Sequence, residues 1–210
     1  MKNTFGSDLS LTIFGESHGR AVGAVLDGMA AGVPVDESFL AACMDKRRAR
    51  GDGLSTPRVE ADAVQLLSGV VNGHTTGTAI ALMIENQNTR SGDYARTADL
   101  LRPGHADYTA GVKYGGHADF AGGGAFSGRL TAPLCIAGGI CLQLLKKQGI
   151  EVISRIASIG SVEDVTPLTA STADKPFPVV DDAAGETMQA EIAAAKAEGD
   201  SVGGIVECAV

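Results

Sequence analysis

The sequence lacks any apolar run long enough to cross a membrane, and residues 1–11 lack the basic start and long apolar core of a signal peptide. It has no surplus of basic residues either. The formal net charge is -8, which argues against a general nucleic-acid binder because such proteins need a basic surface. These absences predict a cytoplasmic protein with no membrane and no nucleic-acid partner.

Cysteine pairs with the spacing of metal or redox sites are also missing. The sequence has 4 cysteines, none of them in a CxxC pair, and each lies in an apolar segment: Cys43, Cys135, Cys141 and Cys208. Free, buried thiols explain this distribution better than disulfides or a zinc site. Reduced cysteines agree with a cytoplasmic location.

The chain has enough apolar residues for one large domain or two small ones, with 44% hydrophobic residues among 210. Leu9, Leu11 and Ile13 alternate with polar residues, which predicts a first strand, and Asp36 is placed to cap the helix that follows. The turn Asn72-Gly73 indicates antiparallel pairing of strands at 64–67 and 79–84. Other expected elements are strands at 22–26, 150–159 and 203–210, a helix at 188–197 and a surface loop at 161–185. A further helix is expected to be capped by Thr131, with Pro133 in its first turn and an apolar stretch at 134–145.

Residues 86–128 are poor in regular periodicity and rich in glycine, arginine and aspartate, as in loops that carry function. Within them, Pro103 and Gly104 form a rigid corner that should hold His105 in place. Histidine has an ordinary pKa near neutral pH, and beside Arg102 it suits proton transfer to an anionic substrate. A turn with a hydrogen-bonded surface histidine is the structural alternative.

A second loop histidine, His18, follows the first expected strand in the segment Gly15-Glu16-Ser17-His18-Gly19. Flanking glycines let the backbone approach a ligand closely, although a plain turn explains them as well. Ser17 and His18 are not expected to form a nucleophile pair, because adjacent side chains rarely point at each other.

Basic residues cluster where the first expected helix ends, at Lys46, Arg47, Arg48 and Arg50, with Arg58 after a short loop. In an acidic protein this concentration suits the focusing of an anionic substrate, and guanidinium groups match phosphate and carboxylate. A solvated basic helix end is the alternative.

A glycine-rich segment, residues 122–129, precedes a helix that is expected to begin near Thr131. Such a loop can bind an anion through backbone N–H groups, while a close packing turn is the alternative. It has neither the spacing of a P-loop nor that of a dinucleotide fingerprint.

The sequence also contains two similar His-x-Asp segments, His105-Ala106-Asp107 and His117-Ala118-Asp119. No zinc or iron spacing is matched, so we expect no metal site. A metal-dependent phosphatase built on these pairs is a third hypothesis, which retained activity in a chelator would exclude.

In this order, the motifs resemble the chorismate synthase family from the first residues to Val210. The segments that carry the resemblance are TIFGESHG at 12–19, SGV at 68–70, TTGT at 75–78, IEN at 84–86 and RPGHADYT at 102–109. The resemblance implies an α+β fold with helices sandwiched between antiparallel β-sheets. It further implies that residues 1–210 are the N-terminal portion of a single domain whose C-terminal part is absent.

The resemblance implies a lyase that converts 5-enolpyruvylshikimate 3-phosphate to chorismate by a 1,4-anti elimination of phosphate. The family uses reduced FMN, with NADPH as a candidate reductant, and its members are typically cytoplasmic homotetramers in aromatic amino acid biosynthesis. The partner implied is therefore a small phosphorylated substrate.

The site residues follow from the same resemblance. His18 matches an acid near the departing phosphate, and His105 matches the histidine that protonates the reduced flavin. Arg48 and Arg129 match substrate-binding arginines. Ala125, Phe126 and Ser127 occupy the place of an FMN-contacting Arg-Ser-Ser segment.

Three positions depart from the family pattern. Gly53 and Ala125 stand where arginines are usual, and Phe126 replaces a serine. The competing hypothesis is therefore a non-catalytic flavin- or anion-binding fragment or pseudoenzyme.

Overall fold

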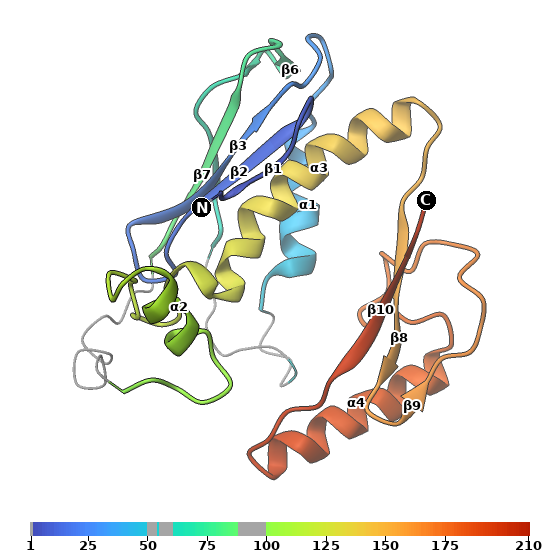
Figure 1. Cartoon of the computed structure of the whole chain (residues 1–210). Helices are drawn as coiled ribbons and strands as arrows, with labels where there is room; N and C mark the ends of the chain where they lie inside the picture. The colour runs from blue at the N-terminus through green and yellow to red at the C-terminus, as the bar shows by residue number, and fades with distance from the viewer. Residues whose placement is uncertain (1, 50–53, 55–60, 88–99) are drawn as a thin grey trace. The chain divides into compact units, whose positions relative to one another are not determined.

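The computed structural model describes residues 2–49, 54, 61–87 and 100–210, which form two compact units (Figure 1). Unit 1 takes most of the described residues up to Leu144, and unit 2 runs from Leu145 to Val210. Arg50, Gly53 and Arg58, together with residues 88–99 of the predicted functional loop, lie outside the described residues.

Unit 1 is built on a five-stranded sheet whose neighbours are all antiparallel. Across the sheet the order is β1 (Thr4–Gly6), β2 (Ser10–Gly15), β3 (Ala21–Asp27), β7 (Ile80–Glu85) and β4 (Val64–Leu66). The strands expected at 22–26, 64–67 and 79–84 are thereby confirmed. The register pairs Gly15 with Val22, so the loop at 16–20 connects the paired ends of β2 and β3.

One face of this sheet forms the core of unit 1. Alternate residues of the central strands are fully or almost fully buried, as the period-two side-chain direction of a strand requires: Val22, Ala24 and Leu26 on β3, and Ile80, Leu82 and Ile84 on β7. Helices α1 (Glu37–Arg47) and α3 (Thr131–Lys147) cover that face (Figure 1). Burial of these apolar side chains is the main stabilisation of unit 1.

Helix α1 begins as the sequence predicts. The Asp36 carboxylate accepts from the backbone N–H of Ser38 at 2.9 Å and of Phe39 at 3.2 Å. The Ser38 hydroxyl and the Phe39 N–H stabilise the charged form and lower the pKa of Asp36. Leu40 and Met44 form the buried face of the helix.

The two helices approach closely at a glycine. A Cβ placed on Gly139 of α3 would lie 2.8 Å from Cδ2 of Leu40 on α1, so only glycine leaves room for that leucine in its present position. Cys43 also lies next to this contact. The close approach packs α3 directly against α1.

The hairpin at Asn72-Gly73 differs from the prediction. The turn has the positive φ values of 49° and 70° typical of a two-residue hairpin turn, but it joins two additional short strands, β5 (Val70–Val71) and β6 (His74–Thr75). The predicted antiparallel pairing of β4 with β7 is confirmed, and β5 and β6 lie between these two strands in the sequence. The turn signal was read correctly, but the strands it joins were placed too far from it.

Helix α3 also begins differently from the prediction. A 3-10 turn, η3 (Gly128–Leu130), leads into the helix, and the side chain of Ser127 caps that turn by accepting from the Arg129 N–H at 3.2 Å. Thr131 is already helical and donates its hydroxyl to the Gly128 carbonyl at 2.6 Å. The cap therefore lies four residues earlier than expected.

Residues 128–147 are long and apolar enough, by length and composition alone, to cross a membrane, contrary to the sequence expectation. The core helix of a globular protein meets the same criterion. Ile136 and Ile140 are fully buried against the sheet of unit 1, which identifies α3 as such a core helix.

Unit 2 contains a three-stranded antiparallel sheet with β8 (Ile153–Ile159) between β10 (Gly204–Ala209) and β9 (Val162–Glu163). Helix α4 (Asp182–Ala197) packs on β8 and β9 and is capped by Asp181, whose carboxylate accepts from the Ala183 N–H at 3.0 Å. The α+β class with antiparallel sheets is confirmed.

The predicted surface loop at 161–185 is wrong in part. It contains β9 and the first turn of α4, and Val179 and Asp164 within it are buried. Burial disfavours the charge on Asp164, but hydrogen bonds from the backbone of Asp181, Thr166 and Val180 outweigh it and lower the pKa of that carboxyl. One buried carboxylate thus organises a segment that shows no periodicity in the sequence.

The cysteines are free, as expected. Cys43, Cys135 and Cys141 are half-buried, and burial raises the pKa of all three thiols. Cys208 is exposed on β10, so the expectation of a buried thiol is wrong there. Residue 208 lies on an edge strand whose side chains are mostly exposed.

Candidate functional site

The GESHG loop turns sharply as it leaves β2. Gly15 has φ +102°, and a Cβ there would lie 2.3 Å from the Ala21 carbonyl oxygen, so the turn requires glycine. Ser17 is buried, and its N–H donates to the Gly124 carbonyl at 3.1 Å. The loop that carries His18 is therefore tied to the glycine-rich segment more than 100 residues later.

The side chains of Ser17 and His18 contact each other, although side chains of adjacent residues rarely do. Ser17 Oγ is 3.1 Å from His18 Nδ1 and also lies 3.4 Å from the Ala121 carbonyl, to which it can donate. The side chains do contact each other, contrary to expectation. Because Ser17 is 1% exposed, it is placed to orient His18 rather than to attack a substrate.

His105 lies at the corner that the sequence predicts, just before helix α2 (Asp107–Lys113). Gly104 has φ +73°, and the His105 N–H donates to the Arg102 carbonyl at 3.4 Å. Nδ1 of His105 is 2.8 Å from Oδ1 of Asp107, and 31% of the histidine side chain is exposed. The ring is held on one side and open to solvent on the other.

Asp107 is bonded on both oxygens. Its side chain is 5% exposed, and Arg102 grips it at 2.7 Å through Nε to Oδ2 and at 2.7 Å through Nη2 to Oδ1. The Arg102 N–H adds a third bond to Oδ2 at 3.0 Å. The guanidinium holds the pKa of Asp107 well below its usual value, despite the opposing effect of burial.

The two histidines meet at consecutive glycines. A Cβ on Gly122 would lie 1.9 Å from Nδ1 of His18, and a Cβ on Gly123 would lie 3.2 Å from Nε2 of His105. The Gly122 carbonyl also accepts from Arg102 Nη1 at 3.5 Å. The structure therefore brings His18, His105 and the glycine-rich segment together.

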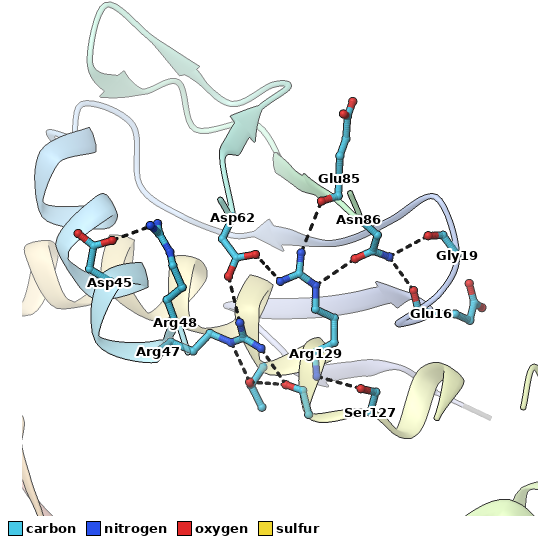
Figure 2. A network of polar contacts seen from close by, with 12 residues as sticks. Glu16, Gly19, Asp45, Arg47, Arg48, Asp62, Glu85, Asn86, Ser127 and Arg129 are labelled. Atoms are coloured by element: carbon cyan, nitrogen blue, oxygen red, sulfur yellow. Dashed lines mark hydrogen bonds and ion pairs between the residues drawn. The ribbon is translucent and has the colours of Figure 1, made fainter. Parts of the chain in front are cut away.

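Arg129 lies in a buried polar network (Figure 2). It pairs through Nη1 with Asp62, donates from Nε to Asn86 Oδ1 at 3.0 Å and reaches the Glu85 carbonyl at 3.5 Å. Its side chain is 7% exposed. Asp62 also accepts from Nη1 of Arg47 at 3.1 Å, so one buried carboxylate serves two arginines.

Asn86 connects this network to the loop of His18 (Figure 2). Its Nδ2 donates to the Glu16 carbonyl at 3.0 Å and to the Gly19 carbonyl at 2.9 Å. Asn86 thus bonds to both sides of His18. The sequence predicts no individual role for Asn86, Asp62 or Arg47, although Asn86 stands in the IEN motif and Arg47 in the basic cluster.

Arg48 is the other predicted substrate-binding arginine. Its Nη2 pairs with Asp45 Oδ1 at 3.0 Å, and 32% of its side chain is exposed. Its Nε is buried, with no acceptor among the described residues. A buried donor without an acceptor costs about 1–3 kcal/mol.

Ala125, Phe126 and Ser127 lie in and just after a 3-10 turn, η2 (Gly124–Phe126). Ala125 and Phe126 are exposed, and the Phe126 ring lies 6.1 Å from that of Tyr114, centroid to centroid. Ser127 caps the following turn through its Oγ. The three predicted cofactor-binding residues are thus adjacent to the glycines that contact the histidines.

The second His-x-Asp segment is arranged differently from the first. Oδ1 of Asp119 accepts from the Ala121 N–H at 2.9 Å, which makes it a turn residue. Within the described part of the chain, no group of three or more histidine, cysteine, aspartate or glutamate side chains is placed to hold a metal ion.

Comparison with known proteins agrees with the motifs. Residues 9–210 match the chorismate synthase family. The chain is 44% identical over 214 residues to chorismate synthase of Dehalococcoides mccartyi, covering 99% of this chain and 58% of that protein. Chorismate synthase of Pyrococcus abyssi is 45% identical over 204 residues, covering 96% and 57%.

A solved structure has the same fold. The crystal structure of chorismate synthase superimposes with a TM-score of 0.70 at 28% identity, covering 95% of this chain and 57% of that one. The chain thus spans 58% of the length of the Dehalococcoides relative. By the match over residues 9–210, the chain belongs to the chorismate synthase family.

Proposed function

We propose that the protein carrying this chain is a chorismate synthase, which eliminates phosphate from 5-enolpyruvylshikimate 3-phosphate to give chorismate with reduced FMN. The observation that carries the proposal is the contact of His18 with Gly122 and of His105 with Gly123. Consecutive Cα atoms lie about 3.8 Å apart, so two proton-transfer groups serve one small region. A 1,4-elimination needs groups that act on two separated atoms of one substrate.

His18 is the acid on the phosphate side. Ser17 Oγ, 3.1 Å from Nδ1, holds the imidazole, and Gly122 packs against the ring. A protonated imidazole fixed in this way stabilises the charge that develops on a departing phosphate, and it needs little reorganisation to do so.

His105 is the acid on the flavin side. Its Nδ1 is engaged by Asp107, so Nε2, next to Gly123, is the atom available for proton exchange. The 31% exposure of the side chain leaves the ring accessible to a bound molecule.

The residues after these glycines fit a flat, anionic cofactor. Phe126 offers an aromatic ring that is 41% exposed, beside the small exposed side chain of Ala125. The Ser127 hydroxyl can donate to a phosphate while its oxygen accepts from Arg129. Reduced FMN, when bound, supplies electron density that protein side chains lack, and NADPH is its proposed reductant.

Arg48 and Arg129 are the proposed substrate-binding cations. The side chain of Arg48 is 32% exposed, so its guanidinium group is accessible to a phosphate or carboxylate oxygen. For Arg129 we propose a contact that leaves its bonds to Asp62 and Asn86 in place, since 7% of its side chain stays exposed.

The location, oligomeric state and partner of the protein are proposed from its membership of the family. The protein is a cytoplasmic homotetramer, and its partner is a small phosphorylated substrate rather than nucleic acid or a membrane. Analytical ultracentrifugation of the protein carrying this chain tests the tetramer.

A second candidate function is a non-catalytic flavin- or anion-binding protein. Two observations favour it: Ala125 carries no charge, and Arg129 is already paired with Asp62. Under this hypothesis ligands bind but no chorismate forms.

Two measurements separate the candidates. The chain is titrated with FMN and with 5-enolpyruvylshikimate 3-phosphate, and chorismate formation is assayed with chemically reduced FMN in the absence of oxygen. Binding with turnover supports the synthase, whereas binding without turnover supports the second candidate. If neither residues 1–210 nor a longer protein that contains them binds either ligand, both candidate functions are contradicted.

A further inference from the structure

His105 is held by a chain of side chains that ends at the glycine-rich segment. Asp107 contacts Nδ1 of the imidazole, Arg102 grips Asp107 through two guanidinium nitrogens, and Arg102 Nη1 reaches the Gly122 carbonyl. The other ring nitrogen of His105, Nε2, lies against Gly123. The Arg102–Asp107 ion pair therefore holds one nitrogen of the His105 ring and leaves the other, Nε2, at the site.

We propose that Asp107, itself fixed by Arg102, is a positioning residue that sets the tautomer and orientation of His105. A carboxylate only accepts hydrogen bonds, so the 2.8 Å contact requires that Nδ1 carry a proton. In the neutral ring the second nitrogen, Nε2, is then the one without a proton. Proton exchange at the site is thereby confined to the atom that faces Gly123.

The proton balance of the step is simple. The imidazolium carries protons on both nitrogens, and Nε2 gives its proton to the acceptor at the site. The ring is left neutral with its proton on Nδ1, still bonded to Asp107. Return of a proton to Nε2 restores the starting state, and Asp107 remains a carboxylate throughout.

Arg102 makes this arrangement rigid. Two parallel bonds of 2.7 Å fix the plane of the Asp107 carboxylate, and a third bond comes from the Arg102 backbone N–H at 3.0 Å. A lysine in place of Arg102 keeps the charge but loses the paired geometry. The charge of Arg102 and its paired hydrogen-bond geometry thus contribute separately to the position of Asp107.

The tautomer of His105 can be measured without substrate or cofactor. Two-bond proton–nitrogen NMR spectra of the ¹⁵N-labelled chain, recorded at a pH where the histidines are neutral, distinguish the two tautomers. The sequence has 4 histidines, and His105→Ala assigns the signal of interest. His74 is an internal reference, because its Nδ1 lies 3.0 Å from the Asn72 carbonyl, which also only accepts.

The test compares Asp107→Asn with the matched variant Asp119→Asn in the second His-x-Asp segment. We expect His105 to be protonated at Nδ1 in the unsubstituted chain and to shift toward the Nε2 tautomer in Asp107→Asn, because an amide can also donate. His74 should be unchanged in both variants, and His105 unchanged in Asp119→Asn. An Nε2 tautomer in the unsubstituted chain, or an unchanged tautomer in Asp107→Asn, overturns the proposal.

The catalytic consequence rests on the proposed function and is measured separately. In a form that makes chorismate, Asp107→Asn should lower kcat by at least about tenfold with little change in KM, because the acid, His105, is misoriented while binding is kept. A change in KM alone contradicts a positioning role. Failure of the synthase proposal would instead appear as no turnover in the unsubstituted protein, with the tautomer result intact.

Discussion

Asp62 and Arg129 form a buried ion pair in which the side chains are 1% and 7% exposed. The same carboxylate bonds Arg47, and through Asn86 the pair is connected to the loop of His18 (Figure 2). The pair therefore joins the segment before α3, the end of α1 and the loop of His18 by contacts between residues that are distant in sequence.

Substitution of Asp62 by alanine should strongly destabilise the chain. It would leave two guanidinium groups without their counter-ion, and breaking a buried pair in this way costs about 3–5 kcal/mol. Urea unfolding at neutral pH measures the loss. Asp45→Ala removes the partner of Arg48, an ion pair whose acid is 64% exposed, and is expected to cost about 1 kcal/mol or less. Equal losses in the two variants would contradict the assignment of Asp62 as the centre of the network.

Gly122→Ala should displace His18. The new methyl group would meet Nδ1 of His18 at 1.9 Å, at a backbone φ of +66°. Gly115→Ala is the matched control, because its φ of +62° imposes similar backbone strain, about 1–2 kcal/mol, while no atom lies within 4 Å of its Cβ. NMR signals of the His18 ring should shift in Gly122→Ala alone. A comparable shift in both variants would mean that backbone strain, rather than contact with the ring, is responsible.

Asn86→Ala should loosen the loop that carries His18. The change removes the amide that bonds the Glu16 and Gly19 carbonyls, and hydrogen exchange of the Gly19 N–H, which donates to Glu16, should become faster. Gln65→Ala is the control, since the Gln65 amide donates to the exposed Glu85 carboxylate at 3.3 Å, away from the loop of His18. Unchanged exchange at Gly19 would show that the loop is held without Asn86.

Asp107 should make stability depend on acid pH. Because Arg102 lowers the pKa of Asp107 in the folded state, the stabilisation is fully present above the ordinary carboxyl pKa, and it is lost as pH falls below that value toward the folded one. The difference in unfolding free energy between the unsubstituted chain and Asp107→Asn is therefore expected to be constant above pH about 5 and to narrow below pH about 4. Denaturant titrations at several pH values measure this difference. A difference that does not change with pH would contradict a lowered pKa.

Local patterns predicted the elements that depend on local physics. The strands at 22–26 and 79–84 were predicted from apolar runs, and in the structure alternate residues of these strands are buried. The Asp36 cap was predicted from the ability of its carboxylate to accept hydrogen bonds from backbone N–H groups. The start of α4 was missed because residues 182–187 have little apolar periodicity, and the helix there depends on the Asp181 cap. The ordered segment around Asp164 was missed because its bonds join residues far apart.

The site was predicted residue by residue but not as an arrangement. Motif resemblance proposed His18, His105, Arg48 and Arg129 as site residues, while the neighbours of these residues are set by tertiary packing. No sequence pattern indicates that Asp62 lies against Arg129, 67 residues away, or that Gly122 packs on His18. Buried ion pairs and close glycine contacts of this kind appear only once the chain is folded.

We propose that His18 and His105 are the acids of a chorismate synthase. The most direct measurement joins residues 1–210 to the part of the Dehalococcoides mccartyi relative that this chain does not match, then follows chorismate formation with reduced FMN. We predict turnover in the joined protein and a loss of about 100-fold or more in His18→Ala and in His105→Ala, with substrate binding retained. Unchanged turnover in both variants, or none in a folded joined protein that binds both ligands, would contradict the account.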